Sequence, residues 1–309
     1  MLRQMLLAAS HHDAVKRVVE NAPVSRGVVD RFIAGEDAGP ALAATARLLS
    51  QGLSVTLDHL GEDTRDRERA AATRDAYTTL LSRLADEGLS HGAEVSLKLS
   101  AVGQFLPRDG EKIAQDNALA ICEAAAVVGT TVTLDMEEHT TTPSTLAIAR
   151  ELRRDFPSLG VVLQAALHRT EADCRELATA GSRVRLCKGA YNVPEYAGFQ
   201  ARHEVDLAYV RCLRTLMSGD GYPMVATHDP RMIEIAGALA VRHGRSRDCY
   251  EYQMLYGIRP DEQRRLASAG ERVRVYVPYG DQWYGYFMRR LAERPANVAF
   301  FVRSVLSKG

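Results

Sequence analysis

The sequence has few cysteines, and no two of them stand at the short spacing that metal sites and redox motifs use. Their number is odd, which argues against a framework of disulfide bonds, and their scatter argues against a zinc site. This usage is typical of a reducing compartment. The five cysteines are Cys122, Cys174, Cys187, Cys212 and Cys249.

Other absences narrow the class of protein. Lysine plus arginine equals aspartate plus glutamate, at 39 each, so no global charge favours nucleic acid. No apolar run approaches the roughly 18 residues that a membrane-spanning helix needs. The apolar start of the chain is followed at once by HHDAVKR, so we do not interpret it as a signal peptide. No GxGxxG motif follows a strand-like run, which counts against a Rossmann domain.

What the sequence does contain is an alternation of short, β-rich runs with longer amphipathic stretches. Strict alternation predicts a parallel sheet, and eight units in roughly 230 residues favour a (β/α)8 barrel of the TIM type over an open sheet. Helical periodicity at the start predicts an N-terminal helical arm, residues 1–50, before an α/β barrel, residues 51–309. The strand-like runs are 53–58, 94–100, 131–136, 160–165, 183–188, 222–227, 249–255 and 272–278.

Polar residues gather at the C-terminal ends of these runs, where barrel enzymes place their active sites. Lys98 stands among apolar residues of the second run, and a buried lysine needs a partner for its charge. Asp135, in the neighbouring third run, poses the same problem with the opposite sign, so we expect the two to pair. Such a pair can be purely structural, and an exposed strand end with Lys98 in solvent is the alternative.

The stretch RLCKGAY could cradle a phosphate, because Arg185 and Lys188 supply charge and Gly189 allows close backbone approach. The alternative is a glycine turn with exposed charges. Asp229, followed by proline, predicts the start of a helix whose free N–H groups could also face a phosphate. His228 has no second histidine at metal-site spacing, so we expect a hydrogen-bonded histidine and no metal site.

The stretch YFMRRLAER follows the last strand-like run and should lie as a helix over the barrel mouth. On a helix, Tyr286, Arg289, Arg290 and Glu293 share one face. Two guanidinium groups at the mouth can hold a carboxylate through paired hydrogen bonds. The alternative is a solvated face on which Glu293 pairs with one of the arginines.

Taken together, these segments resemble the proline dehydrogenase family, whose members are flavin-dependent barrels that oxidise L-proline. The matching blocks are LDHLGE, SLKLSA, TLDMEE, VLQA, VRLCKGAY, ATHD, YEYQML, VYVPYG and YFMRRLAER, in the family's order. They cover roughly residues 53 to 297. One departure is Asn192 after Tyr191, where some members carry a tryptophan that stacks on adenine. The resemblance implies the monofunctional form, without an aldehyde dehydrogenase domain.

The resemblance implies noncovalently bound FAD and the first step of proline catabolism. Hydride would pass from proline C5 to flavin N5, 1-pyrroline-5-carboxylate would form, and the electrons would pass to a membrane quinone. No metal and no nucleic acid are expected. The expected location is the cytoplasm, with peripheral contact at the inner face of the cell membrane as an addition. The apolar tail, residues 297–309, could make that contact, although packing on its own domain is favoured.

The resemblance also assigns roles by position. Glu62 would pair with Arg289 and close over the substrate, and Asp135 would pair with Lys98. The catalytic residues would be Arg185, Asp135 and Tyr276, with Arg185 near flavin N5. The substrate would contact Lys98, Arg289, Arg290, Tyr276, Tyr286, Leu255 and Glu62. The cofactor would contact Gln164, Arg185, Lys188, Gly189, Ala190, Tyr191, Thr227, His228, Gln253 and Glu293.

The residues leave other functions open. A Schiff-base aldolase could use Lys98 or Lys188 as its nucleophile, and it would be colourless. A noncatalytic barrel could bind a carboxylate through the paired arginines without turnover. Within the proline reading, no residue is interpreted as a dedicated base, and the positive pocket should lower the pKa of the substrate amine. Tyr276 should crowd a 4-hydroxyl group, so hydroxyproline should be a poor substrate.

Overall fold

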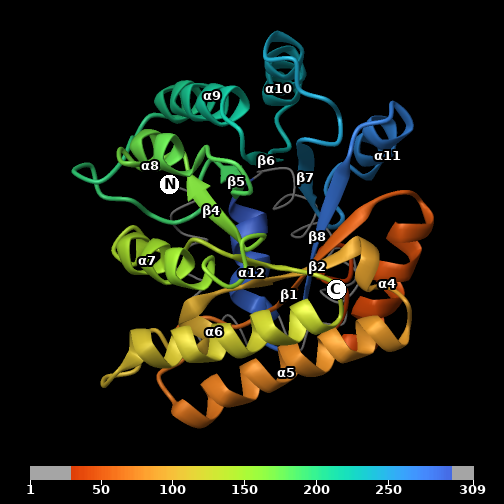
Figure 1. The fold of residues 1–309 in the computed structure, drawn as a ribbon, viewed down its shortest axis with the longest axis vertical. Helices are drawn as coiled ribbons and strands as arrows, with labels where there is room; N and C mark the ends of the chain where they lie inside the picture. Colours follow the sequence, from red (N-terminus) through yellow and green to blue (C-terminus); the bar gives the residue numbers. More distant parts are fainter. Residues whose placement is uncertain (1–28, 294–309) are drawn as a thin grey trace, which may run out of the picture.

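The protein folds as a closed barrel of eight parallel strands surrounded by helices (Figure 1). The computed structural model describes residues 29–293 of the chain, and the side chains of residues 29–290. The strands follow each other around the barrel in sequence order, and β8 closes it by pairing with β1 over residues 54–59 and 274–279. The predicted (β/α)8 barrel is therefore confirmed.

Each strand-like run of the sequence forms a strand, within three residues at either end. The second run is shorter than predicted, because β2 ends at Leu97 and a short 3-10 helix, η2, begins at Leu99. Lys98 lies between them, so its side chain leaves the end of the strand and not its interior. The strands are β1 Ser54–His59, β2 Ala93–Leu97, β3 Val132–Leu134, β4 Gly160–Gln164, β5 Arg183–Cys187, β6 Tyr222–Ala226, β7 Glu251–Leu255 and β8 Val273–Tyr279.

The helices connect the strands on the outside of the barrel. The α10 helix begins as the sequence predicts, with Asp229 as its N-cap and a proline in the first turn. Between the strands lie α5 Arg67–Asp86, η1 Ser90–Gly92, η2 Leu99–Val102, α6 Gly110–Val127, α7 Thr142–Leu152, α8 Thr170–Leu177, α9 Arg202–Ser218, α10 Pro230–Arg242 and α11 Pro260–Ser268. Before β1 lies α4 Ala38–Ser50, and after β8 lies α12 Trp283–Glu293.

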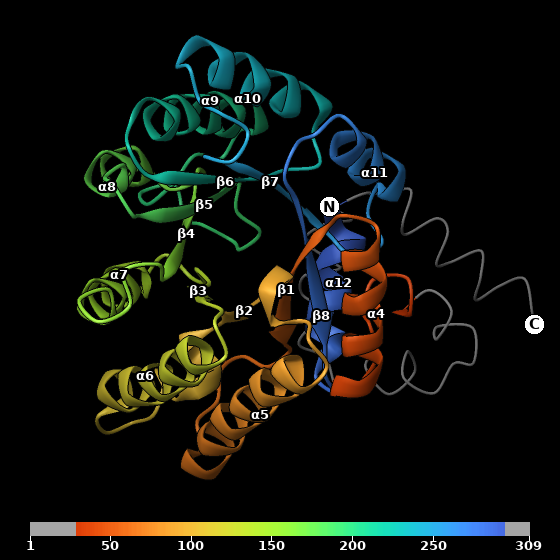
Figure 2. The same cartoon turned by 45° about the vertical axis from the view of Figure 1, so that its right-hand side comes forward.

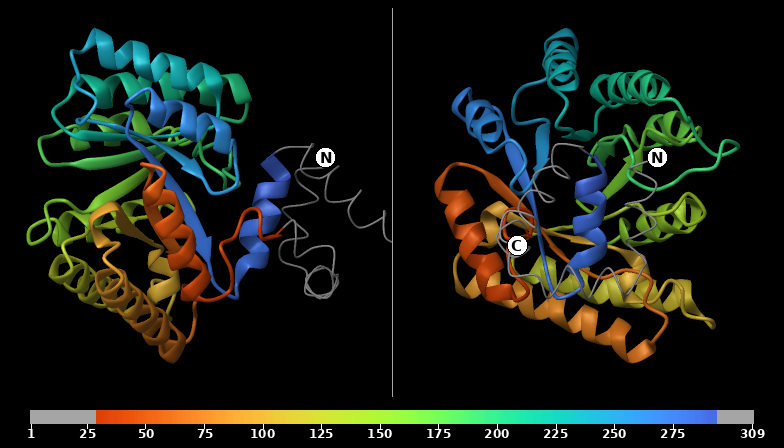
Figure 3. Two further views of the ribbon diagram at one scale, coloured as in Figure 1. Left: turned by 90° about the vertical axis from the view of Figure 1, so that its right-hand side faces the viewer. Right: turned by 180° about the vertical axis from the view of Figure 1, so that it is seen from behind.

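Two helices of the described residues, α4 and α12, depart from simple alternation. The α4 helix belongs to the range expected as an arm, yet it packs against both β1 and β8, in the place where the helix after β8 would stand (Figure 2). The α12 helix instead crosses the end of the barrel, as Figure 3 shows in its right-hand view. Residues 1–28 and 294–309, which include most of the expected arm and the apolar tail, lie outside the described residues.

A separate hydrophobic cluster seats α12 over the barrel mouth. Phe287 is fully buried in it, and Leu60 after β1 and Ile258 after β7 supply contacts from the C-terminal ends of the strands. The predicted helix over the mouth is therefore present. The other buried members are Val29, Phe32, Ile33, Trp283, Tyr284, Tyr286 and Met288.

The barrel interior is polar, which the apolar runs do not suggest. Successive side chains of a strand face opposite sides, so Val95 and Leu97 of β2 face the helices while Glu94 faces the barrel axis. Glu94 is 1% exposed and lies 2.7 Å from Arg183 Nη2 and 3.8 Å from Arg274 Nε. Burial alone would raise the pKa of Glu94, but the surrounding arginines lower it to about 2.

Candidate active site

Lys98 lies at the floor of the mouth and pairs with a carboxylate that sequence reasoning left without a role. Its Nζ is 2.8 and 2.7 Å from the two carboxylate oxygens of Asp58, at the end of β1. The expected partner, Asp135, is farther away at 3.8 Å. Asp58 is fully buried, so the two buried charges compensate each other. Burial tends to lower the pKa of Lys98, but Asp58 and Asp135 outweigh it and raise that pKa.

Asp135 is placed between two other candidate residues. Its Oδ1 accepts a hydrogen bond from Arg185 Nη1 at 2.7 Å, and its Oδ2 accepts one from the Tyr276 hydroxyl at 2.7 Å. Burial, followed by the charge of Asp135, raises the pKa of Tyr276 well above its usual value. Tyr276 is therefore a neutral donor, and the structure brings the three predicted catalytic residues together.

Arg185 is held rigidly from several sides. Its Nε donates to Gln253 Oε1 at 2.5 Å, and its Nη1 donates to Ser96 Oγ at 3.0 Å. The guanidinium carbon lies 5.3 Å from the centre of the Tyr276 ring. Nη2 is buried and finds no hydrogen-bond acceptor in the part of the chain that the structure describes, although Glu94 Oε1 is 3.5 Å away. A buried donor without a partner calls for an explanation such as a bound ligand.

The α12 helix, which crosses the barrel mouth, carries Arg289 and Arg290. Arg289 forms two bonds with Glu62, from Nη1 to Oε1 at 2.6 Å and from Nη2 to Oε2 at 3.0 Å. The expected pair of Glu62 and Arg289 is thus present. Arg290 is buried, and its guanidinium carbon lies 4.9 Å from the centre of the Tyr286 ring. The side chain of Glu293 lies outside the described residues.

Tyr191 lies on the same side of the mouth as α12. The guanidinium carbon of Arg289 is 5.7 Å from the centre of its ring. Burial, followed by the charge of Glu62, raises the pKa of Tyr191 well above its usual value. Sequence reasoning placed Tyr191 with the cofactor, and the structure puts it next to the pair of Glu62 and Arg289.

The turn after β5 has the shape of a cradle. Gly189 has a φ of +109°, a conformation that other residues avoid, and an added Cβ would lie 3.2 Å from Gln164 Oε1. Gln164 itself donates to the backbone oxygen of Glu137 at 2.7 Å. Ala190 follows in the same turn and is half-buried. Such a turn lets the backbone approach a flat ring closely.

Lys188 does not offer an uncompensated charge for a phosphate. Its Nζ bonds Asp206 and also Asp229, at 3.0 Å from the latter. Arg231 bonds the same two carboxylates, so the cluster holds two cations and two anions. Asp229 Oδ1 also accepts the N–H of Arg231 and occupies the start of α10. The free helix end expected from the sequence is therefore already capped by its own aspartate.

His228 acts as a hydrogen-bonding residue between two loops, as predicted. Its Nε2 accepts the backbone N–H of Leu255 at 2.9 Å, and its backbone oxygen accepts from Arg259 at 2.8 Å. Thr227 Oγ1 accepts the N–H of Asp229 at 3.1 Å. The bond to His228 Nε2 holds Leu255, a residue expected near the substrate. Over residues 29–293, no group of three or more His, Cys, Asp or Glu side chains could hold a metal ion.

The sequence prediction assigned no role to several residues that support the site. Asp58 could have been found from strand alternation, because it lies one residue before the end of β1, and Lys98 directly follows the neighbouring strand β2. Ser100 and Glu137 bond each other, with 2.5 Å between Ser100 Oγ and Glu137 Oε1. Glu137 is 6% exposed, and burial raises its pKa to about 7. Its place directly after TLDM, at the C-terminal end of the third strand-like run, was the one signal for it.

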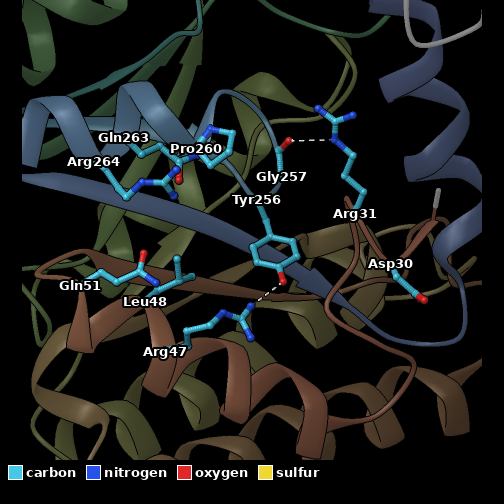
Figure 4. A pocket seen from close by; sticks show the side chains of 10 residues that line it. All are labelled: Asp30, Arg31, Arg47, Leu48, Gln51, Tyr256, Gly257, Pro260, Gln263 and Arg264. Carbon is cyan, nitrogen blue, oxygen red and sulfur yellow. Dashed lines mark hydrogen bonds between the residues drawn. The ribbon is translucent and has the colours of Figure 1, made fainter. Parts of the chain in front are cut away.

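A separate cavity of about 230 Å³ lies on the flank of the barrel, between α4 and the loop after β7 (Figure 4). Arg47 Nη2 donates to the Tyr256 hydroxyl across it at 2.8 Å, and Arg31 Nε reaches Gly257 O at 3.4 Å. None of the predicted site residues lines this cavity. The candidate active site is therefore the barrel mouth. No helix within residues 29–293 is long and apolar enough to cross a membrane.

Comparisons with known proteins point to one family. The family model described as proline dehydrogenase matches residues 41–303. Proline dehydrogenase 2 of Bacillus subtilis is 38% identical over 284 residues, which is 92% of either chain. Proline dehydrogenase 1 of the same species is 35% identical over the full length of both chains. Proline dehydrogenase of Deinococcus radiodurans is 38% identical over 90% of either chain.

Solved structures share the fold at low sequence identity. Proline utilization A from Bdellovibrio bacteriovorus, inactivated by N-propargylglycine, superposes with a TM-score of 0.81 at 23% identity. The match covers 96% of this chain and 35% of that one, so this chain spans about a third of the larger protein. Proline utilization A from Corynebacterium freiburgense gives a TM-score of 0.76 at 21% identity, over 34% of its length.

Proposed function

The chain belongs to the proline dehydrogenase family, and we propose that it oxidises L-proline to 1-pyrroline-5-carboxylate at the mouth of its barrel. The observation that carries this proposal is the placement of Arg289 and Arg290 on α12, above the buried pair of Lys98 and Asp58. Cations above a polar floor suit a small amino acid whose carboxylate must be held and whose ring must lie flat.

The substrate carboxylate would bind the arginines and Lys98. A guanidinium has five N–H donors, so Arg289 can keep Glu62 and still donate to a second carboxylate. Lys98 stays protonated because Asp58 and Asp135 raise its pKa, and it can donate without becoming a nucleophile. Glu62 would then close over the bound substrate while it orients the guanidinium.

The wall of the pocket would position the ring. The bond between Tyr276 and Asp135 fixes the tyrosine ring in one orientation. Leu255, held by His228, would supply an apolar contact opposite it. The three cations around the pocket disfavour a protonated substrate amine, so proline would be bound as the free amine that supports oxidation. No side chain is assigned the role of general base.

The residues of the mouth fit FAD at its ring end. Bound FAD would supply the two-electron acceptor, taking hydride from proline C5 at N5 and handing the electrons to a membrane quinone. Arg185, Gln164 and the Gly189 turn would hold the ring, since they offer a buried donor, an amide and close backbone approach. Lys188, Ala190, Tyr191, Thr227, His228, Gln253 and Glu293 complete the proposed cofactor site.

The Schiff-base alternative is disfavoured by the same geometry. A nucleophilic lysine must lose its proton, yet Lys98 is buried against Asp58 with a raised pKa. Lys188 bonds two carboxylates and is equally committed. A noncatalytic barrel remains as the competing reading of the paired arginines, and it predicts binding of proline without turnover.

The visible spectrum of the purified protein tests the proposal. We expect a flavin spectrum that bleaches when L-proline is added without oxygen, and that does not respond to D-proline. A flavin that ignores L-proline would reject the substrate and keep the cofactor. A colourless protein that FAD cannot reconstitute would reject both, and a colourless protein that still binds proline would support the noncatalytic barrel.

A further inference from the structure

The loop that carries Glu62 is held by a residue of the next barrel unit. This loop, residues 60–66, connects β1 to α5. The backbone N–H of Asp63 donates to Ser100 Oγ at 3.2 Å, and that of Thr64 donates to Ser100 O at 3.1 Å. Asp63 has a φ of +58°, a conformation that residues other than glycine rarely adopt, so contacts must maintain it. Ser100 is thus the anchor of the loop.

Ser100 is in turn oriented by Glu137. Its hydroxyl donates to Glu137 Oε1 at 2.5 Å, and its backbone N–H donates to Oε2 at 3.3 Å. A serine hydroxyl carries one hydrogen, so giving it to the carboxylate turns the lone pairs toward the N–H of Asp63. Both Ser100 and Glu137 are buried, so water does not replace these bonds.

The charges around Glu137 come from several elements of the mouth. Lys98, after β2, attracts its carboxylate, while Glu62, after β1, repels it. Tyr191, after β5, also faces it and is neutral at ordinary pH because its pKa is raised. Burial is the largest influence and brings the pKa of Glu137 to about 7. Its charge therefore changes in the range where the protein would work.

We propose that Glu137 is a positioning residue for substrate capture, which acts through Ser100 to hold the loop of residues 60–66 so that Glu62 meets Arg289. The ionised carboxylate accepts the Ser100 hydrogen strongly and keeps the loop in place. The protonated form accepts it weakly and loosens the loop, so the mouth holds its substrate less well at lower pH. The role in capture rests on the proposed function, because Arg289 is assigned there to the proline carboxylate.

Two measurements test this in Glu137→Gln, whose side chain keeps the shape and stays neutral. The first is amide hydrogen exchange of peptides covering residues 60–66, corrected for the intrinsic effect of pH, and it needs no substrate. At pH 8.5 we expect exchange about threefold to tenfold faster than in the wild type, as fits the loss of one charge-assisted hydrogen bond. At pH 6 the two proteins should converge.

The second measurement is the steady-state kinetics of proline oxidation at the same two pH values. We expect KM of the variant to exceed that of the wild type by about threefold to tenfold at pH 8.5, with kcat little changed. The ratio of the two KM values should approach one at pH 6. Using this ratio cancels the effect of substrate-amine protonation, which is the same for both proteins. The matched control is Glu138→Gln, the same change at an exposed neighbouring position, which should follow the wild type at both pH values.

Ser100→Ala provides a second variant, because it removes the link without changing a charge. It should speed exchange of residues 60–66 at both pH values, and adding Glu137→Gln to it should change little further. Equal exchange in the wild type and Glu137→Gln at pH 8.5 would overturn the proposal, as would a KM ratio that does not depend on pH. If the loop responds but proline never bleaches the flavin, the link between Glu137 and the loop stands and the proposed function fails.

Discussion

Arg289 and Glu62 are separated by 227 residues in sequence, and they meet across the barrel mouth through two hydrogen bonds of 2.6 and 3.0 Å. Their side chains are 15% and 27% exposed, and a partly exposed ion pair adds little to stability. Its effect is positional, since it joins the helix after β8 to the loop after β1. The guanidinium is thereby presented toward the mouth in a fixed orientation.

Removing either arginine of α12 should weaken proline binding. We expect Arg289→Met and Arg290→Met each to raise KM by about 10- to 100-fold, because a paired, charge-assisted contact with the substrate carboxylate is lost. The effect on kcat should be smaller, since the contact is present before and during reaction. Steady-state kinetics on protein of matched flavin content would measure this.

The control for the arginines is Arg265→Met on α11. Arg265 is exposed and bonds Glu262 at 2.7 Å, so its loss removes the same charge far from the mouth. Its KM should equal that of the wild type. Should both α12 variants keep the wild-type KM, the arginines do not bind the carboxylate, and the solvated-face interpretation of YFMRRLAER returns.

Lys98 and Asp58 should be coupled in stability. Lys98→Met leaves the fully buried Asp58 carboxylate uncompensated, which we expect to lower the free energy of unfolding by about 3–5 kcal/mol. The double variant Lys98→Met with Asp58→Asn should recover part of that loss, because no buried charge is left alone. Urea unfolding of the four proteins gives the coupling energy. Simple additivity of the two single changes would show that Lys98 and Asp58 do not depend on each other.

Local sequence patterns were sufficient for the barrel and for the helix over its mouth. An apolar run rich in β-branched residues predicts each strand. Polar residues spaced so that they share one helix face predict α12. The pairing of Glu62 with Arg289 came from family resemblance, because no local pattern links residues so distant. The predicted arm includes the α4 helix, because periodicity indicates a helix but not the strands on which that helix packs.

The partners of buried charges were harder to predict. The sequence analysis predicted an ion pair between Lys98 and Asp135, but the carboxylate oxygens nearest to Lys98 belong to Asp58. Which carboxylate lies nearer depends on the register between β1 and β2. No role was predicted for Glu94, the first residue of the second strand-like run. Its place on the axis depends on Arg183 and Arg274, which come from β5 and β8. The partner of a buried charge depends on contacts between segments that are distant in sequence. Local sequence patterns do not predict these contacts.

Tyr276 should decide between proline and its 4-hydroxylated form. We expect Tyr276→Ser to gain activity toward hydroxyproline, because the ring that would crowd the hydroxyl is gone. Tyr276→Phe keeps the ring and loses only the 2.7 Å bond to Asp135, so it should gain none. The ratio of kcat/KM for the two substrates measures the change. If both variants gain activity toward hydroxyproline, the hydrogen bond to Asp135 determines the selectivity. If neither variant gains it, Tyr276 does not determine the selectivity.

The stability of the protein should depend on pH through Glu137. Its pKa is raised from 4.5 to about 7 by burial, so the folded protein holds this proton more tightly than the unfolded chain does. Raising the pH across that interval therefore removes stability, by up to about 3 kcal/mol from this one group. Glu137→Gln has no such titrating group, so its stability relative to the wild type should rise between about pH 4.5 and pH 7 and level off above that range.

Urea unfolding of the wild type, Glu137→Gln and Glu138→Gln at several pH values would measure this dependence. Glu138 is exposed, so its variant should run parallel to the wild type throughout. Parallel curves for Glu137→Gln as well would mean that Glu137 titrates normally, and the loop of residues 60–66 would then lose its pH-dependent support. A stability difference between Glu137→Gln and the wild type that rises with pH would show that Glu137 changes its charge in this range. Ser100, which bonds both Glu137 and Asp63, links that change to the loop of residues 60–66.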